Sequence, residues 1–296
     1  MLIAHGILRR YPIADGKRKH MLNNKQIAFI GSGVMAEAMI KGLLRDNLIT
    51  PDRIVAAGPR EERGRVLEER YGVTSSTENR SAAEGRDIVV LSTKPQVIGK
   101  VLQELRGAIP EGALVISIAA GVSIRTVADG LIHSEIVRAM PNTPAQIGQG
   151  VTVWYATASV SDNQVNQTEA ILGALGEQVQ MGDEVYLDMA TALSGTGPAY
   201  VLLFMEAMID AGVHLGFSRR IAERLVLQTM QGTVEYARQS GRHPATLRNE
   251  VTSPGGTSAE ALYHMEKGGL RTVISRSIWA AYERSVALGR RQNGLD

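Results

Sequence analysis

Residues 27–44 read "IAFIGSGVMAEAMIKGLL", and this stretch decides the fold of the first half of the chain. The run 27–30 is wholly apolar, as in a buried strand. Apolar side chains then recur at helical spacing, at Ala38, Met39, Leu43 and Leu44. A strand that turns directly into a helix predicts the opening unit of an α/β domain.

Between strand and helix lies Gly31-Ser32-Gly33-Val34-Met35-Ala36, a G-x-G-x-x-A pattern. Gly31 permits a tight turn, and Gly33 lets the backbone approach a pyrophosphate. Ala36 is small enough for the helix to pack closely on the sheet, and the amino end of that helix faces the phosphates. In this setting the pattern predicts a dinucleotide site. A glycine turn without a ligand is the alternative.

The rest of the first half repeats the alternation of strand and helix. Continuous apolar runs separated by helical stretches are typical of a parallel sheet covered on both faces. We therefore expect a Rossmann-type doubly wound domain over residues 21–182. The further runs are "RIVAA" (53–57), "DIVVLST" (87–93), "ALVISIA" (113–119), "EIVRAM" (135–140) and "VTVWYA" (151–156).

The end of the second predicted strand bears on the choice of dinucleotide. An NAD site expects an acidic residue there for the ribose 2′-hydroxyl, but this chain has Gly58, Pro59 and Arg60. A cation suits a 2′-phosphate, so the sequence favours NADPH over NADH, with NADH as a second possibility. In the other interpretation Arg60 is an exposed residue at a helix start, neutralised by Glu61 and Glu62.

Three later strand ends carry rigid or glycine-containing loops. Because ligands bind at the carboxyl ends of strands in such sheets, these loops are expected to form the rim of the cofactor cleft. They are "STKPQ" (92–96), "SIAAGVS" (117–123) and "AMPNTP" (139–144).

After residue 183 the strand-like runs stop and the pattern becomes helical, so we expect an all-α domain over residues 183–296. The stretch "GPAYVLLFMEAMIDAGVHLG" (197–216) is apolar nearly all round a helix and requires cover on every side. A small helical domain supplies little such cover, which predicts dimerisation as an obligate homodimer. Helices are expected at 184–193, 198–215, 218–239, 244–250, 257–267 and 270–292.

Two more glycine motifs precede predicted helices, "LSGTGPAY" (193–200) and "SPGGTSAE" (253–260). In the second, Thr257 is the expected N-cap, with Glu260 completing a capping box. Such a box stabilises a helix with or without a ligand. The two flexible glycines before it favour a site where backbone N–H groups and the hydroxyls of Thr257 and Ser258 hold a carboxylate.

Composition narrows the other possibilities. The 296 residues are enough for two domains, and they include no cysteine, so disulfides and thiolate chemistry are excluded and a cytoplasmic location is expected. A net charge of +2 and 4% aromatic residues give nucleic-acid binding little support, and no metal site is expected. Residues 199–215 come closest to a membrane span but contain Glu206 and Asp210, so a membrane partner is not expected.

Residues 1–20 carry five basic side chains against one acidic one. We expect them to be an extension outside the fold. A transit peptide is the alternative, which Asp15 and the lack of serine disfavour.

Taken in order, the motifs of residues 25–292 resemble those of the pyrroline-5-carboxylate reductases, which make L-proline. The resemblance rests on the stretch 27–44, on the "TKPQ", "MPNTP" and "SGTGPAY" motifs, and above all on "VTSPGGTSAEAL" (251–262). It implies hydride transfer from NAD(P)H to 1-pyrroline-5-carboxylate, the last step of proline biosynthesis, by a homodimer that can assemble further into a ring of dimers.

The resemblance also implies roles for individual residues. Ser258 departs from the threonine usual at that place in the family; it keeps the hydroxyl but loses the methyl group. By resemblance, the pyrophosphate lies at Gly31, Gly33, Val34 and Met35, the 2′-phosphate at Gly58, Pro59 and Arg60, the adenosine ribose at Asn79, and the nicotinamide half at Thr93, Lys94 and Ala120. The substrate carboxylate lies at Gly255, Gly256, Thr257 and Ser258, where Thr257 and Ser258 take the catalytic role and the Ser258 hydroxyl lies near the ring nitrogen.

Two rival functions remain. A β-hydroxyacid dehydrogenase, or a related imine reductase, shares the two-domain plan. The former carries a catalytic lysine at the place of Val201, which cannot transfer a proton. A non-catalytic nucleotide-binding protein is the other rival, and the intact glycine motifs disfavour it.

Overall fold

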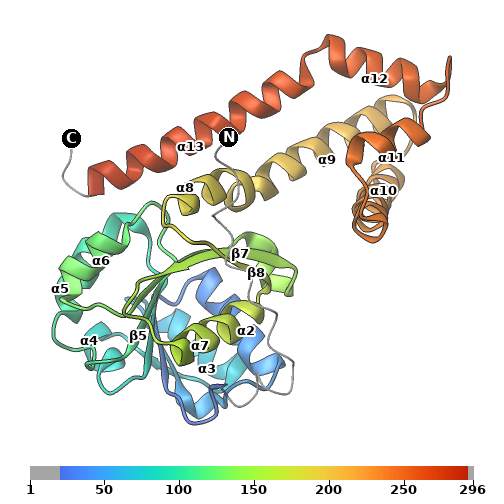
Figure 1. Ribbon diagram of the computed structural model, residues 1–296. Helices are drawn as coiled ribbons and strands as arrows, with labels where there is room; N and C mark the ends of the chain where they lie inside the picture. The colour runs from blue at the N-terminus through green and yellow to red at the C-terminus, as the bar shows by residue number, and fades with distance from the viewer. Residues whose placement is uncertain (1–20, 293–296) are drawn as a thin grey trace. The chain divides into compact units, whose positions relative to one another are not determined.

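A single sheet of eight strands organises the first part of the chain, in the order β3-β2-β1-β4-β5-β6-β7-β8 (Figure 1). The computed structural model describes residues 21–292, so the expected extension 1–20 lies outside the described residues. The strands are β1 (Ile27–Ile30), β2 (Ile54–Ala57), β3 (Thr74–Ser76), β4 (Ile88–Leu91), β5 (Leu114–Ser117), β6 (Ile136–Met140), β7 (Gly150–Ala156) and β8 (Gly176–Gln180).

Strands β1 to β6 are parallel, and Ile27 in β1 lies opposite both Ile54 and Ile88. The predicted doubly wound sheet is confirmed over these strands. Strand β7 is antiparallel to β6, so the expectation of a parallel strand there is wrong. The nine residues between them hold only the short 3-10 helix η3 (Thr143–Ile147), and a parallel return needs a longer crossover.

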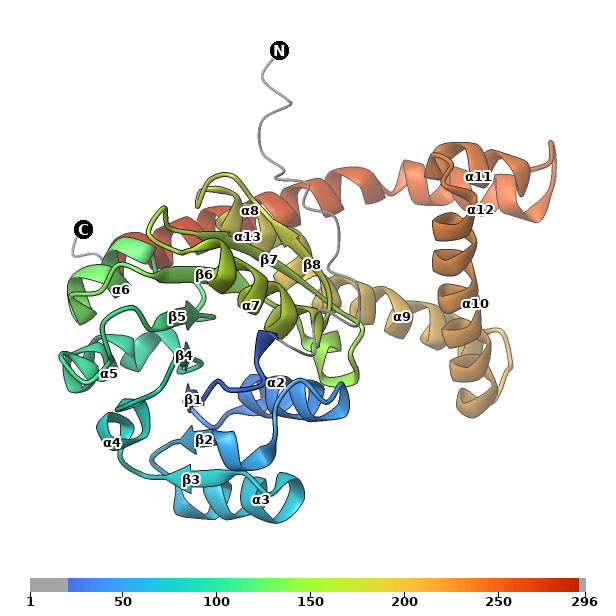
Figure 2. The ribbon, with the colours of Figure 1, turned by 60° about the horizontal axis from the view of Figure 1, so that its bottom comes forward.

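Helices cover both faces of this sheet (Figures 1 and 2). Alternate strand residues point to opposite sides. Phe29 therefore packs with Met39 and Ile171 on one face, while Ile30 packs with Leu102 and Val127 on the other. The first face is covered by α2 (Val34–Arg45), α3 (Glu61–Tyr71) and α7 (Asp162–Gly173), and the second by α4 (Asn79–Ala83), α5 (Ile98–Leu105) and α6 (Ile124–Leu131).

The contacts divide the chain into two units. One consists of the described residues up to Thr196 together with the end of α13 from Ala281, and the other is Gly197–Ala280. The last strand ends at Gln180, but α8 (Tyr186–Ala190) still contacts β6 and β7 and so belongs to the first unit. A domain limit at residue 183 therefore marks the change of secondary structure and remains a proposal.

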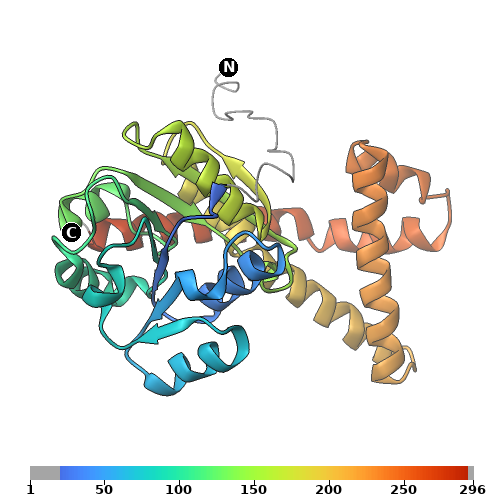
Figure 3. The same ribbon diagram turned by 90° about the horizontal axis from the view of Figure 1, so that it is seen from below.

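The second unit contains helices alone. Its elements are α9 (Gly197–His214), α10 (Arg219–Ser240), α11 (Pro244–Glu250), α12 (Thr257–Lys267) and the first part of α13 (Leu270–Gln292). Figure 3 shows α9 and α10 meeting at the turn that joins them. No residue of α9 is buried, although this helix is largely apolar. The helical run Tyr186–His214 is also long and apolar enough, by length and composition alone, to cross a membrane.

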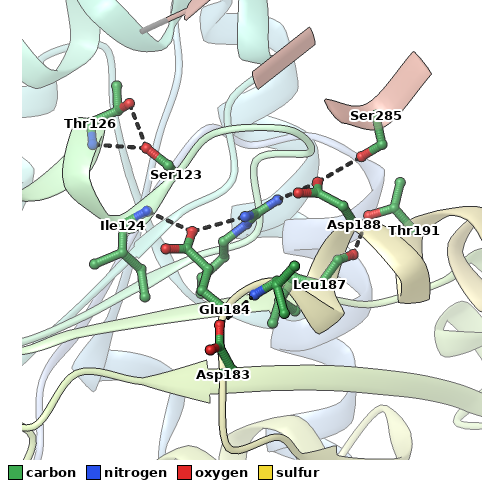
Figure 4. A network of polar contacts seen from close by, with 11 residues as sticks. Ser123, Ile124, Thr126, Asp183, Glu184, Leu187, Asp188, Thr191 and Ser285 are labelled. Carbon is green, nitrogen blue, oxygen red and sulfur yellow. Dashed lines mark hydrogen bonds and ion pairs between the residues drawn. The ribbon is translucent and has the colours of Figure 1, made fainter. Parts of the chain in front are cut away.

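Within the first unit, a buried arginine in β6 links α8 and the end of α13 to the sheet. Arg138 in β6 is 6% exposed, and its guanidinium donates to Glu184 at 2.8 Å and to Asp188 at 3.0 Å. Glu184 also accepts the backbone N–H of Ile124 at 2.8 Å, and the Ser285 hydroxyl donates to Asp188 at 2.8 Å (Figure 4). One charge network thus joins β6, the start of α6, α8 and α13.

Candidate active site

The glycine turn after β1 has the geometry that the sequence predicts for it. Gly31 has φ +108°, and a Cβ there would lie 2.7 Å from the backbone C and O of Ser92. Gly33 caps α2, and a Cβ on it would meet nothing within 4 Å. The first N–H groups of α2 have no acceptor inside the helix, and Val34 beside them is 59% exposed. This turn can present backbone donors to an anion.

Two side chains hold the carbonyl groups of this turn, and sequence reasoning assigned a role to neither. The Ser92 hydroxyl, after β4, donates to the Gly31 carbonyl at 2.7 Å. Arg63 in α3 donates from Nε to the Ser32 carbonyl at 2.8 Å. Both contacts join residues about 30 or 60 positions apart, so only the fold brings them together.

Arg63 is itself held by Glu37 in the first turn of α2, to which its Nη2 atom donates. Glu37 also accepts bonds from Tyr71 Oη at 2.9 Å and Arg70 Nη1 at 3.2 Å. Burial alone would raise the pKa of Glu37, but the bonds from Arg63, Tyr71 and Arg70 and the charge of Arg63 bring the pKa below its ordinary value. Glu37 is therefore an anion at neutral pH.

The predicted adenosine residues lie at the carboxyl ends of β2 and β3. Gly58 is buried and packs on Ser32, while Pro59 is exposed. Arg60 is exposed at the N-cap of α3, and it has no ion pair among residues 21–292. Asn79 begins α4 and donates to Glu104 at 2.8 Å.

Glu61 does not neutralise Arg60, because its ion pair is with Arg65 at 2.6 Å. That part of the alternative interpretation of Arg60 is wrong. An exposed guanidinium that is not paired within the described chain is available to an anionic group.

The predicted nicotinamide residues follow β4 and β5. The Thr93 hydroxyl is buried, and within the described part of the chain it has no hydrogen-bond partner. Lys94 is exposed at the N-cap of the 3-10 helix η2 (Pro95–Val97). Ala120 precedes Gly121, which has φ +72° and packs on α13 beside Leu288.

All of these positions belong to one edge of the sheet. The strand order reverses between β1 and β4, and the Gly31 turn and Thr93 lie beside each other at that reversal. Ligands of open α/β sheets bind outside the carboxyl ends of the strands at such a point. A surface hollow of about 450 Å³, lined by residues such as Lys25, Asp87 and Glu111, lies at the opposite, amino ends and contains none of the predicted site residues.

The third glycine motif forms a tight turn before α12. Gly255 has φ +70°, and the N–H of Gly256 donates to the Ser253 carbonyl at 3.0 Å. Gly256 is the N-cap of α12, so the expectation that Thr257 caps the helix is wrong. The extended backbone that a cap requires lies at Gly256, and Thr257 is already helical.

The capping box that would have explained this motif without a ligand is therefore not formed. No side chain caps α12, and Glu260 lies 3.3 Å from His264 Nε2. The hydroxyls of Thr257 and Ser258 and the N–H groups of the first turn remain at the open end of the helix. Thr257 is exposed and Ser258 half-buried.

The second glycine motif begins a helix, as expected, because α9 starts at Gly197 with Pro198 in its first turn. Residues Thr191–Gly195 form a π-helix directly after α8, and Thr196 is the bend that separates it from α9. The Asn142 side chain of the "AMPNTP" loop fixes this segment, donating to the Ser194 carbonyl at 3.2 Å and accepting the Val151 N–H at 3.0 Å. The boundary between the two units falls inside this motif, after Thr196.

The chemistry available to these residues is binding and positioning. Among residues 21–292 no group of three or more His, Asp or Glu side chains could hold a metal ion. In the first unit, the turn after β1 offers backbone N–H groups that can hold phosphates. In the second unit, the first turn of α12 offers N–H groups and hydroxyls that can hold a carboxylate.

Comparison with known proteins identifies both halves of the chain. A family model for pyrroline-5-carboxylate reductase dimerisation matches residues 184–288, and a model for a coenzyme F420-dependent NADP oxidoreductase matches residues 26–121. A pyrroline-5-carboxylate reductase from Synechocystis sp. is 41% identical over 266 residues, which are 90% of this chain and 99% of that relative.

Solved structures agree with this result over the same length. A pyrroline-5-carboxylate reductase from Coxiella burnetii is 37% identical, with a TM-score of 0.83, and the match covers 90% of this chain and 99% of that one. A pyrroline carboxylate reductase from Plasmodium falciparum, solved with NADP bound, is 33% identical, with a TM-score of 0.82 and the same coverage.

Proposed function

Since this chain belongs to the pyrroline-5-carboxylate reductase family, we propose that it reduces 1-pyrroline-5-carboxylate to L-proline by hydride transfer from NAD(P)H, the last step of proline biosynthesis. The observation that carries this proposal within the structure is the open amino end of α12 after Gly255 and Gly256. A glycine turn after β1 is common to many dinucleotide enzymes and does not indicate the substrate. The turn before α12, which is suited to a carboxylate, is what indicates the substrate of this chain.

The residues at the edge of the sheet fit a nicotinamide dinucleotide. A side chain on Gly33 would occupy the space that a pyrophosphate needs. The Thr93 hydroxyl, which has no hydrogen-bond partner among residues 21–292, offers a polar contact to the nicotinamide half. Arg60 is the cation for a 2′-phosphate, which makes NADPH the preferred donor and NADH the second choice. Val34, Met35, Gly58, Pro59, Asn79, Lys94 and Ala120 complete the proposed set.

In the proposed mechanism the chain contributes orientation. The N–H groups at the start of α12 hold the substrate carboxylate, and the helix dipole strengthens that attraction by up to about 1 kcal/mol. Thr257 and Ser258 add their hydroxyls, and that of Ser258 lies at the imine nitrogen, where it stabilises the protonated ring. When bound, NAD(P)H would supply the hydride that the imine carbon accepts, and the ring nitrogen would keep its proton as a secondary amine.

No nucleophile or metal ion is needed in this scheme. The protonated C=N bond is already electrophilic, so catalysis consists of holding donor and acceptor carbons about 3–3.5 Å apart while water is excluded. The alternative of alcohol oxidation, as in a β-hydroxyacid dehydrogenase, requires a base where this chain has Val201 in α9. That side chain has no proton to transfer.

The exposed apolar helices support an assembly of at least two chains. Leu202, Leu203 and Phe204 in α9 are all exposed, and a monomer rarely exposes a large apolar patch. The patch falls within residues 184–288, which match the dimerisation model. We propose an obligate homodimer in the cytoplasm, in which a second copy rather than lipid covers α9, with a ring of dimers as the larger form.

Initial rates test the function directly. We expect the purified chain to oxidise NADPH only when 1-pyrroline-5-carboxylate is added, to form L-proline in equal amount, and to leave β-hydroxyacids unchanged in the presence of NADP. Nucleotide binding without turnover of the imine would instead favour a non-catalytic nucleotide-binding protein.

A further inference from the structure

We infer that Arg63, held by Glu37, is a positioning residue that orients the backbone N–H of Gly33 for the pyrophosphate and so strengthens the binding of NADPH and NADH equally. The inference rests on the proposed function, because it assumes that a dinucleotide occupies the Gly31–Ala36 turn. It adds to that function a residue that touches no ligand and acts only through the peptide group it holds.

The geometry of a single peptide unit carries the argument. The Ser32 carbonyl and the Gly33 N–H belong to the same planar group, and in a trans peptide they point in opposite directions. No cis peptide occurs among the described residues. Arg63 Nε donates to the Ser32 carbonyl at 2.8 Å from the α3 side. The Gly33 N–H is therefore directed away from α3.

The preceding peptide unit is held in the same way. The Ser92 hydroxyl donates to the Gly31 carbonyl at 2.7 Å, which orients the N–H of Ser32. Gly31 and Gly33 flank Ser32, and glycine backbones have the greatest conformational freedom. Without these two donors the turn would sample orientations in which its N–H groups do not converge on an anion.

Glu37 explains why Arg63 does not bind the phosphate itself. The carboxylate of Glu37 accepts the Arg63 Nη2 atom, while Tyr71 and Arg70 donate to its other oxygen at 2.9 and 3.2 Å. The Arg63 side chain is 22% exposed and that of Glu37 18%. The edge of the guanidinium formed by Nε and Nη2 is thus committed inside the protein, whereas Arg60, one helical turn earlier, is exposed and has no ion pair within the described chain.

The shape of the arginine side chain also matters. Its planar fork donates to two acceptors at fixed angles, whereas a lysine ammonium is a single point charge. Arg63 uses this fork to connect the Ser32 carbonyl in the turn with Glu37 in α2. A lysine at this place would keep the charge but could not hold both acceptors in the same geometry.

The test compares dissociation constants of the full chain for NADPH, NADH and ADP-ribose by titration calorimetry. We expect Arg63→Met to raise all three constants about tenfold, the loss expected for a hydrogen bond from a charged donor. Because NADPH and NADH share the pyrophosphate, the NADPH-to-NADH ratio should stay within about twofold of the wild-type value. KM for both nucleotides should rise with the constants, while kcat falls by less than about twofold.

Two further variants keep the test decisive if Arg63→Met folds poorly. Arg63→Lys should lie between wild type and Arg63→Met, and Glu37→Gln should weaken all three ligands by less than Arg63→Met does. Arg65→Met is the matched control, because Arg65 lies on the same helix in an exposed pair with Glu61. We expect that control to bind all three ligands as the wild type does.

Either of two results would overturn the inference. An Arg63→Met protein that loses thermal stability but binds all three ligands with wild-type constants shows that Arg63 only supports the fold. A variant that loses NADPH affinity alone shows that Arg63 contacts the 2′-phosphate directly. A wild-type chain that binds no nucleotide contradicts the proposed function instead, so the two failures are distinguishable.

Discussion

The turn at position 256 leaves little room for a side chain. A Cβ built on Gly256 would lie 2.6 Å from the Ser253 hydroxyl and 3.2 Å from the Ser253 carbonyl. The same small residue leaves the first turn of α12 open toward a ligand. Gly255 beside it has φ +70°, a conformation that other residues rarely adopt. The geometry of the turn therefore favours glycine at both positions, and the same two glycines leave the amino end of α12 open to a ligand.

The Gly256→Val substitution tests that residue. A branched side chain displaces the Ser253–Gly256 turn and fills the space beside the N–H groups, so we expect KM for 1-pyrroline-5-carboxylate to rise at least about tenfold. The dissociation constant for NADPH should stay within about twofold. Gly99→Val is the control, because a Cβ on Gly99 meets nothing within 4 Å on the exposed side of α5. An unchanged KM in Gly256→Val would contradict the assignment.

Arg60 offers a second test, now of the cofactor. Replacing it with glutamate sets a negative charge against the 2′-phosphate, so kcat/KM for NADPH should fall about tenfold or more. The value for NADH, which has no 2′-phosphate, should change by less than about twofold. The measurement is the ratio of the two kcat/KM values before and after the substitution. Equal kinetics with both donors in both proteins would remove Arg60 from the site.

Single residues also show where sequence reasoning ends. The turns at Gly31–Gly33 and Gly255–Gly256 could be predicted because their patterns are local, with turn and helix start adjacent in the chain. The roles of Ser92 and Arg63 could not, since each bonds a carbonyl that only the folded sheet brings near. The prediction that Thr257 caps α12 is wrong, because backbone angles, which the sequence does not reveal, decide which of two neighbouring residues is the N-cap.

Among the secondary-structure elements, those with strong apolar periodicity were predictable and the polar ones were not. Strands β1, β2, β4, β5 and β6 are buried apolar runs, and their prediction is confirmed. Strands β3 and β8 form the two edges of the sheet, with the polar sequences "TSS" and "GEQVQ", and were missed. An edge strand has less apolar surface to bury, so hydrophobicity gives little sign of it.

The elements α8 and α13 depend on the charge network of Arg138. Removing one partner of a buried ion pair leaves an unpaired charge and typically costs 3–5 kcal/mol. Arg138→Met should therefore lower the free energy of unfolding of the first unit by about that amount. Urea denaturation at fixed protein concentration measures it. A loss below about 1 kcal/mol would show that the network contributes little.

Two serines that each donate to a carboxylate, one buried and one on the surface, provide a matched comparison for this network. Ser285 donates to Asp188 at 2.8 Å where it is 4% exposed, and Ser134 donates to Glu135 at 2.9 Å on the surface. Ser285→Ala should cost about 1.5–3 kcal/mol because its acceptor is charged and largely buried. Ser134→Ala should cost less than about 0.5 kcal/mol. Equal costs would contradict the role of burial.

At the scale of the whole molecule, the second unit is incomplete as a monomer. Only three of its described residues have buried apolar side chains, namely Ala222, Val226 and Leu247, while large apolar side chains cover α9 and α10. A helical unit with so small a core gains stability from a partner chain. Folding and association of this unit are therefore expected to be coupled.

Leu203→Glu tests the association. Leu203 in α9 is 67% exposed in the single chain, and a charge there would be buried without a partner in a dimer interface. We expect sedimentation velocity to show the wild type as a dimer or larger and the variant as smaller species, with loss of activity. Ile147→Glu is the control, since Ile147 is equally exposed on the first unit. A monomeric, active wild type would contradict the proposed assembly.

The structure of the full chain bound to a proline analogue tests the central claim most directly. We expect the carboxylate of the analogue to accept hydrogen bonds from the N–H groups of Thr257 and Ser258, with the Ser258 hydroxyl near the ring nitrogen. An analogue bound elsewhere, with the first turn of α12 making no contact to it, would contradict the account.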